Sequence, residues 1–218
     1  MGLAAGLLVD SAALAAPARA TQAAADVRIT MQPDACDVAM QLDLDLPAPG
    51  SIEHRLALAE GLIVDGLTVT GAGTAGEPRP VGRTLALPIA FAGSGRQSYA
   101  LRYRAALPGG RLHRCPLFLP LTPTDGLSRS VMLQVTVPPG ASRLPGDFPA
   151  FVWDAEGRGR AALGHLPAFV LVRTHAPGEP LGWLERFDTR RVVDLSAIAI
   201  LIGASAIWAA AQRRRRIA

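Results

Sequence analysis

The sequence predicts an all-β protein: an antiparallel β-sandwich followed by one C-terminal transmembrane α-helix. Three observations lead to this fold class. Short alternating segments are separated by glycine and proline, no amphipathic helical pattern appears between residues 26 and 180, and residues 192–211 form one long apolar run. Short strands at near-regular spacing are typical of a sandwich, whereas α/β folds require helices between their strands.

The strand candidates begin soon after the N-terminal leader. Residues 27–31 alternate between apolar and polar side chains, and so do residues 38–46, where Asp43 and Asp45 fall on one face and three leucines on the other. Alternation is expected for a half-buried strand because successive side chains point to opposite faces. The other strand candidates are residues 52–58, 62–70, 84–91, 98–106, 131–137, 150–153 and 169–173.

The first twenty residues resemble a secretory signal peptide. They are apolar and alanine-rich, and they end in an A-x-A pattern at Ala18 and Ala20. Asp10 interrupts the apolar run and no positive charge precedes it, so an uncleaved anchor or a disordered leader stays as an alternative. We expect a signal peptide over residues 1–20, with residue 25 as the other boundary considered, and an exported domain over residues 26–180.

A transmembrane helix is predicted at residues 192–211, whose only charge is Asp194. Twenty helical residues at about 1.5 Å each cross the roughly 30 Å hydrocarbon core of a bilayer. A buried helix of a soluble domain is the alternative, but such helices rarely stay apolar on every face. The anchor residues that we single out are Val192, Ile198, Ile202, Gly203 and Trp208.

The flanks of this span predict its orientation. Four consecutive arginines follow it, in a tail over residues 212–218, and such clusters are retained on the cytoplasmic side. These topology determinants are Arg213, Arg214, Arg215 and Arg216. In the juxtamembrane segment, residues 181–191, Trp183 and Phe187 are expected at the bilayer interface. We therefore expect a single-pass protein of the cytoplasmic (inner) membrane, with its N-terminal domain outside and its C-terminus inside.

The distribution of charge narrows the choice of partners. All 22 basic residues are arginine, and the stretch from Asp26 to Asp194 holds 17 arginines and 17 acidic residues, so this part has no net charge. It therefore lacks the basic footprint expected of a nucleic-acid-binding domain. We expect the lipid bilayer and another membrane or periplasmic protein as partners. Ala199 and Gly203, four positions apart, would also permit weak pairing of two helices.

The two cysteines, Cys36 and Cys115, are a candidate disulfide. An even pair in an exported domain is more often bridged than free, and closing the long loop between them would contribute on the order of 4 kcal/mol. Two buried thiols are the alternative, because spacing alone does not show that two strands meet.

No catalytic, cofactor-binding or metal-binding residues are predicted. His113 and Cys115 lack the second pair of ligands that a zinc site requires, and His54, His165 and His175 each stand alone. Ser94 lies between two glycines in a turn rather than in the strand-turn-helix setting of a nucleophile elbow.

Three segments carry a resemblance to a known family. They are residues 99–107 (YALRYRAAL), residues 133–140 (LQVTVPPG) and residues 164–172 (GHLPAFVLV). Together they resemble the N-terminal β-domain of gluzincin-type (alanyl-aminopeptidase class) aminopeptidases. The zinc helix motif His-Glu-x-x-His and the substrate motif Gly-x-Met-Glu-Asn are absent. The resemblance therefore implies a sandwich fold and no peptidase chemistry.

The function expected from these observations is non-catalytic. The exported sandwich would act as an interaction or accessory subunit that holds a partner at the membrane surface. One alternative is a membrane-tethered hydrolase or carbohydrate-active module, whose loop-built cleft would gather His113, Asp125 and His165. Another is a receptor for a small apolar ligand, which an open end between the two sheets would indicate.

Overall fold

Every element of the described chain is a β-strand. The computed structural model describes residues 20–108, 111–122 and 130–175, which confirms the all-β prediction for these ranges; the predicted C-terminal helix lies outside them. The strands are β1 (Thr21–Met31), β2 (Ala35–Leu46), β3 (Gly50–Ala57), β4 (Ile63–Gly71), β5 (Gly73–Ala75), β6 (Arg79–Val81), β7 (Thr84–Phe91), β8 (Gly95–Ala106), β9 (Arg114–Pro116), β10 (Leu119–Pro120), β11 (Val131–Thr136), β12 (Ser142–Arg143), β13 (Val152–Trp153), β14 (Arg158–Leu163), β15 (Phe169–Leu171) and β16 (Thr174–His175).

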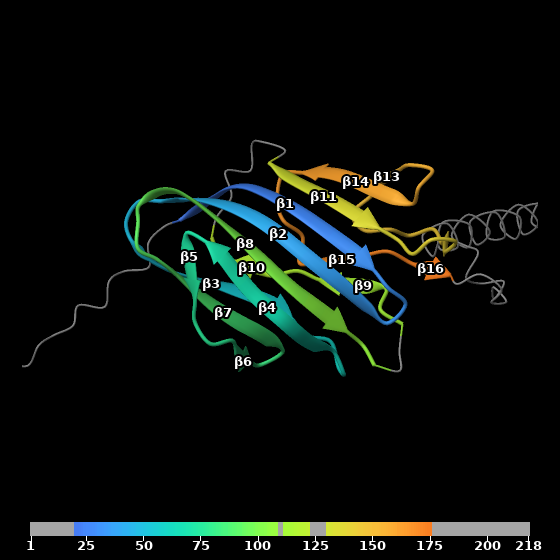
Figure 1. Cartoon of the computed structure of the whole chain (residues 1–218), viewed down its shortest axis with the longest axis horizontal. Helices are drawn as coiled ribbons and strands as arrows, with labels where there is room; N and C mark the ends of the chain where they lie inside the picture. The colour runs from blue at the N-terminus through green and yellow to red at the C-terminus, as the bar shows by residue number, and fades with distance from the viewer. Residues whose placement is uncertain (1–19, 109–110, 123–129, 176–218) are drawn as a thin grey trace, which may run out of the picture.

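The strands form two principal sheets. The larger has seven strands in the order β13-β14-β11-β1-β2-β8-β4, and the smaller has the order β10-β3-β7-β5 with β6 paired to β7. Two short ribbons, β12-β16 and β15-β9, complete the fold. Figure 1 shows the long strands β1, β2, β8 and β4 side by side. The core between the sheets includes Leu42 and Leu101 from the larger sheet and Leu56 and Leu87 from the smaller.

The larger sheet is mixed rather than wholly antiparallel. β1 pairs with β11 in parallel, with Ala25 opposite Val131 and Thr30 opposite Thr136, so the prediction of an antiparallel sandwich was wrong at this pair. The two strands are about a hundred residues apart, and the intervening chain passes through the smaller sheet before it returns. Alternation identifies which face of a strand is buried, but it does not identify the neighbouring strand or its direction.

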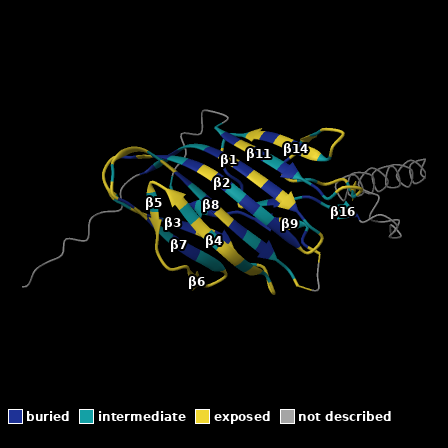
Figure 2. Ribbon diagram, in the orientation of Figure 1, coloured by how far each residue is buried: buried dark blue, intermediate teal, exposed yellow. Residues whose placement is uncertain are grey.

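The alternation itself is confirmed along β2. Leu42, Leu44 and Leu46 are buried against the smaller sheet, whereas Asp45 is exposed and Asp43 is half-buried on the outer face. Figure 2 shows the same banding of buried and exposed residues along β1, β2 and β8. Burying a leucine side chain stabilises a fold by about 2 kcal/mol. A shift of one residue would turn these buried leucines to solvent, so their burial fixes the register of the sheet.

The differences from the sequence-based expectation include the start of β1 and one strand, β14, that was not predicted. β1 begins at Thr21, so it includes Asp26, where we placed the start of the exported domain. β14 was not predicted, because its sequence RGRAAL contains two arginines and a glycine. Arg158 and Arg160 point to solvent on the outer face, and Gly159 lies under the indole ring of Trp153, which leaves little apolar pattern to detect.

Candidate functional site

The cysteines form a disulfide at one end of the sandwich. Cys36 lies in β2 of the larger sheet and Cys115 lies in β9; their Cα atoms are 6.2 Å apart and both residues are fully buried. The bond between them confirms the sequence-based candidate. It ties the β9-β15 ribbon to the larger sheet, and so it fixes the segment that precedes Cys115.

Backbone hydrogen bonds hold the same segment in place. The amides of Leu107 and Leu112 donate to the carbonyls of Asp34 and Pro33, at 2.7 and 2.9 Å, in the turn between β1 and β2. The carbonyl of His113 accepts from the amide of Val172 at 2.9 Å. Residues 111–116 therefore lie in a fixed position beside the end of the sandwich, although they contain only one short strand.

An apolar hollow of about 250 Å³ lies between this segment and the β3–β4 connection. β3 belongs to the smaller sheet and β4 to the larger, so the hollow is an open end between the two sheets. Its wall is mainly apolar, and the leucines Leu58, Leu62 and Leu107 are only half-buried there. The apolar lining residues are Ala57, Leu58, Ala59, Leu62, Leu107, Leu112, Pro116 and Phe169.

Basic side chains form the polar part of this hollow. They are Arg111, His113 and Arg114, and none of the described lining residues is acidic. The guanidinium carbon of Arg114 lies 3.6 Å from the centroid of the Phe169 ring. Stacking of this kind is attractive and holds the cation in place beside the apolar wall. The arrangement can therefore bind an anion next to an apolar surface.

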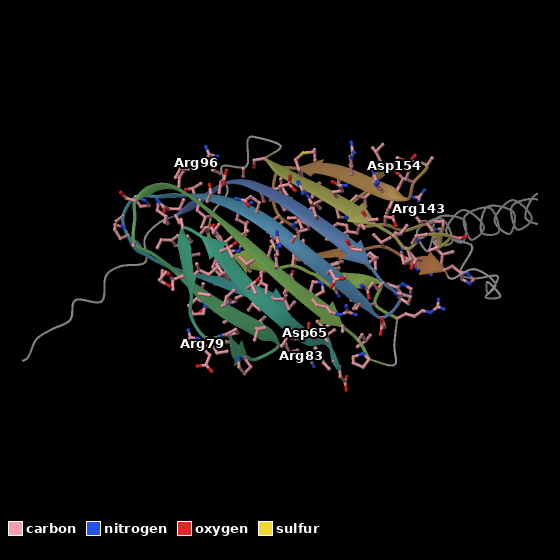
Figure 3. The ribbon with its side chains drawn as sticks, in the orientation of Figure 1. Asp65, Arg79, Arg83, Arg96, Arg143 and Asp154 are labelled. Atoms are coloured by element: carbon pink, nitrogen blue, oxygen red, sulfur yellow. A yellow bond between two sulfur atoms is a disulfide. The ribbon has the colours of Figure 1, made fainter. Side chains whose placement is uncertain are left out.

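A second hollow adjoins the first. It measures about 130 Å³, shares Arg111 and His113 with the larger hollow, and extends to Thr174 and His175. His175 ends β16 and is the last described residue before the predicted anchor. Figure 1 places β9 and β16 at the same end of the molecule, and Figure 3 shows Arg96 at the opposite end.

A third hollow lies on the outer face of the larger sheet. Ala39 and Ala100 form its floor, Arg28 and Arg102 flank it, and its volume is about 210 Å³. Arg28 also faces Asp26, with 3.4 Å between Nε and Oδ1. Both members of this ion pair are largely exposed, so the pair contributes little to stability.

A buried polar pair lies in the core, away from the hollows. The imidazole of His54 in β3 hydrogen-bonds the hydroxyl of Tyr99 in β8, and both side chains are buried. Burial lowers the pKa of His54 from 6.5 to about 4 and raises the pKa of Tyr99, so both groups are neutral at pH 7. From the sequence alone, His54 was identified only as a histidine without a second metal ligand nearby in the chain. Its alternation with the apolar residues Ile52 and Leu56 already indicated that it faces the core.

The side chain of Trp153 organises a smaller structural cluster. Its indole nitrogen donates to Oδ2 of Asp147 at 2.8 Å, and the guanidinium carbon of Arg143 lies 4.2 Å from the ring centroid. Burial raises the pKa of the Asp147 carboxyl, while the hydrogen bond from Trp153 and the charge of Arg143 act in the opposite direction. The cluster anchors the chain between β12 and β13.

Of the three residues expected around a hydrolase cleft, the two that the structure describes, His113 and His165, do not line a common hollow among these three. His113 lines the open-end hollow, His165 is exposed and lines none of the three hollows, and Asp125 lies outside the described ranges. Within those ranges, no group of three His, Cys, Asp or Glu residues is close enough to hold a metal ion.

The predicted membrane residues all lie outside the described part of the chain. These are the interface aromatics Trp183 and Phe187, the anchor residues Val192, Ile198, Ile202, Gly203 and Trp208, and the arginines from Arg213 to Arg216. In the ranges that the structure describes, no helix has the length and hydropathy needed to cross a bilayer.

Comparison with known proteins yields structural likeness alone. No family model and no curated protein sequence matches the chain. The chain is similar to a mutant of the M1 zinc metallopeptidase of Deinococcus radiodurans bound to a Tyr-Ser-Ala substrate, with 15% identity over 70% of this chain and 39% of that one and a TM-score of 0.36. It is also similar to leukotriene A4 hydrolase of Saccharomyces cerevisiae, with 11% identity over 79% of this chain and 34% of that one and a TM-score of 0.44.

These comparisons confirm the weak resemblance to zinc aminopeptidases that the sequence predicts. The chain spans less than half of the length of either protein. At this low identity and partial coverage, the likeness carries no information about activity, substrate or partner.

Proposed function

We propose that the chain is a single-pass membrane-anchored protein whose exported, non-catalytic β-sandwich acts as an interaction or accessory subunit at the membrane surface. The open end between the two sheets is its binding site. The observation that carries this proposal is the apolar hollow bordered by Arg111, His113 and Arg114. Binding sites are commonly concave and mainly apolar, with a few polar groups that orient what they bind.

The position of the hollow supports a role close to the bilayer. Its smaller neighbour reaches His175, and 16 residues lie between His175 and the predicted span that begins at Val192. An extended chain covers at most about 3.5 Å per residue, so this link spans no more than roughly 55 Å. The open end of an anchored sandwich would therefore stay within reach of the lipid headgroups and of neighbouring membrane proteins.

The composition of the hollow supports binding rather than catalysis. The Arg114 guanidinium carries hydrogen-bond donors and no acceptor, so it can hold an anion but offers no group that would take a proton from a substrate. The apolar wall supplies a surface that is stabilised when it is covered. A ligand or a partner segment with both features would be held at this end of the sandwich.

Two measurements on native membranes test the proposal. The chain should stay in the membrane pellet after alkaline carbonate extraction, and release into the supernatant would refute the anchor. A photo-crosslinking amino acid at the exposed position of Ala59, in the wall of the hollow, should yield a specific crosslinked species. The same amino acid at exposed Ala92, at the other end of β7, should not. Equal crosslinking from both positions would refute the site.

A further inference from the structure

The geometry points to one class of ligand for the open-end hollow. We propose that it binds an anionic amphiphile with a single acyl chain, such as a fatty acid or a lysophospholipid, with the chain against the apolar wall and the anionic head at Arg114. This inference rests on the proposed function, which assigns the open end as the binding site.

The wall of the hollow is suited to an acyl chain. Leu58 and Leu62 lie on the side of the β3–β4 connection, and Leu107 and Phe169 lie on the other side. All four side chains are only half-buried, so an aliphatic chain placed between them would remove further apolar surface from water. The wall offers few hydrogen-bonding groups, which disfavours a sugar or a polar peptide in the same place.

The cation at the edge of the apolar wall is suited to a carboxylate or a phosphate. Arg114 presents a planar fork of N–H donors, the group that best matches the two oxygens of such an anion. Arg114 is exposed and stacked on Phe169, so its charge lies at the edge of the apolar wall.

The size of the hollow favours one acyl chain over two. Its volume of about 250 Å³ is below the range of roughly 300–1,000 Å³ that is usual for drug-sized ligands. The adjoining hollow, which shares Arg111 and His113 with it, is smaller still at about 130 Å³. A phospholipid with two acyl chains would leave one of them outside.

The test uses the full chain in phosphatidylcholine nanodiscs, because a detergent is itself an amphiphile and would compete. A photoactivatable dodecanoic acid should label the chain saturably, and mass spectrometry should locate the label in residues 57–62, 107–108 and 111–116. Unlabelled dodecanoic acid should displace the label, whereas its methyl ester should compete at least tenfold less well. Competition by lysophosphatidylglycerol as strong as that by the fatty acid would identify a membrane lipid as the natural source. Weaker competition would identify a free fatty acid.

Matched variants locate the site. Ala59→Trp, which fills the hollow from an exposed position, and Arg114→Glu, which reverses the charge at its edge, should each weaken labelling at least tenfold. Ala92→Trp and Arg96→Glu make the same changes at the opposite end of the sandwich and should leave labelling unchanged. Near-ultraviolet circular dichroism should show that all four variants keep the native fold.

The outcomes separate this inference from the function on which it rests. Unsaturable or scattered label, or equal effects of the paired variants, would overturn the amphiphile site. The anchor and the crosslink from Ala59 could still hold in that case. Specific labelling of a chain that carbonate releases from membranes would instead refute the anchor and leave the ligand assignment standing.

Discussion

Nε2 of His54 lies 2.5 Å from the hydroxyl oxygen of Tyr99, although the two residues belong to opposite sheets. Their rings meet edge to face with centroids 5.6 Å apart, and Phe91 packs on Tyr99 in the same manner at 5.3 Å. Nδ1 of His54 has no hydrogen-bond partner of good geometry in the described structure, although a backbone group of Ile52 is near enough to favour protonation slightly. A neutral imidazole thus bridges the two sheets inside an apolar core.

The first prediction is that acid destabilises the domain through His54. The folded-state pKa of about 4 lies below the usual 6.5, so between these pH values the unfolded chain binds a proton that the folded chain does not. Neutral His54 therefore makes its full contribution to the free energy of unfolding above pH 6.5. That contribution, about 3 kcal/mol in total, is lost as the pH falls toward 4. Urea denaturation of the full chain at pH 7, 6, 5 and 4.5 would measure this loss.

Two glutamine variants isolate the effect. His54→Gln can still hydrogen-bond Tyr99 but does not titrate, so its stability should change little between pH 6.5 and 4.5. His165→Gln alters an exposed histidine and should keep the wild-type pH dependence. Glu53 does not interfere in this pH range. Hydrogen bonds from Arg55 and then Arg79 lower the pKa of Glu53 below its ordinary value of 4.5, so the contribution of this carboxylate to the free energy of unfolding is lost only as the pH falls below 4.5. An unchanged slope in His54→Gln would show that another group is responsible.

The parts of the fold that the sequence predicted are those where one face of a strand meets a continuous core. Leu42 and Leu44 in β2 and Leu101 in β8 face the smaller sheet, and period-two alternation follows directly from that burial. β14 was not predicted because its buried position 159 is a glycine, which has no apolar side chain. The Trp153 ring occupies the space that a side chain at this position would need.

The candidate site could not be predicted for a different reason. Its two walls, residues 57–62 on one side and residues 107–108 and 111–116 on the other, are distant in the chain. The pairing of β4 with β8, which puts Ile63 opposite Ala106, brings them together. The parallel pairing of β1 with β11 is equally non-local. Periodicity reports on the environment of one segment and contains no information about which segments become neighbours.

The second prediction concerns the disulfide between Cys36 and Cys115. Its 79-residue separation means that the bond restricts much of the unfolded chain, so the double variant Cys36→Ala/Cys115→Ala should lose on the order of 4 kcal/mol of stability. Urea denaturation under oxidising conditions would compare it with the wild type. A reducing agent should destabilise the wild type toward the variant and leave the variant itself unchanged. Equal urea midpoints for the wild type and the variant under oxidising conditions would contradict the argument.

The third prediction compares two glycines of β4. Gly71 has φ of +102°, and a Cβ there would lie 2.7 Å from the Ser98 carbonyl oxygen and 2.9 Å from the Cα atom of Tyr99. Gly66 has φ of +60°, and a Cβ there would meet nothing within 4 Å. Gly71→Ala should therefore cost more than about 2 kcal/mol, whereas Gly66→Ala should cost about 1 kcal/mol for its backbone conformation alone. Thermal unfolding of both variants checks the order, and the reverse order would contradict the close strand approach at Gly71.

The last prediction concerns orientation in the membrane. Moving the four arginines that begin at Arg213 across a bilayer is costly, so the segment after the predicted span should stay in the cytoplasm. The native cysteines are buried in a disulfide and should not react with a thiol reagent, so a single added cysteine can report its own location. In spheroplasts, a membrane-impermeant maleimide should label Ala92→Cys at once and should label Gln212→Cys only after lysis. Labelling of Gln212→Cys in intact spheroplasts, with Ala92→Cys protected, would establish the opposite topology and would place the open end of the sandwich in a reducing compartment.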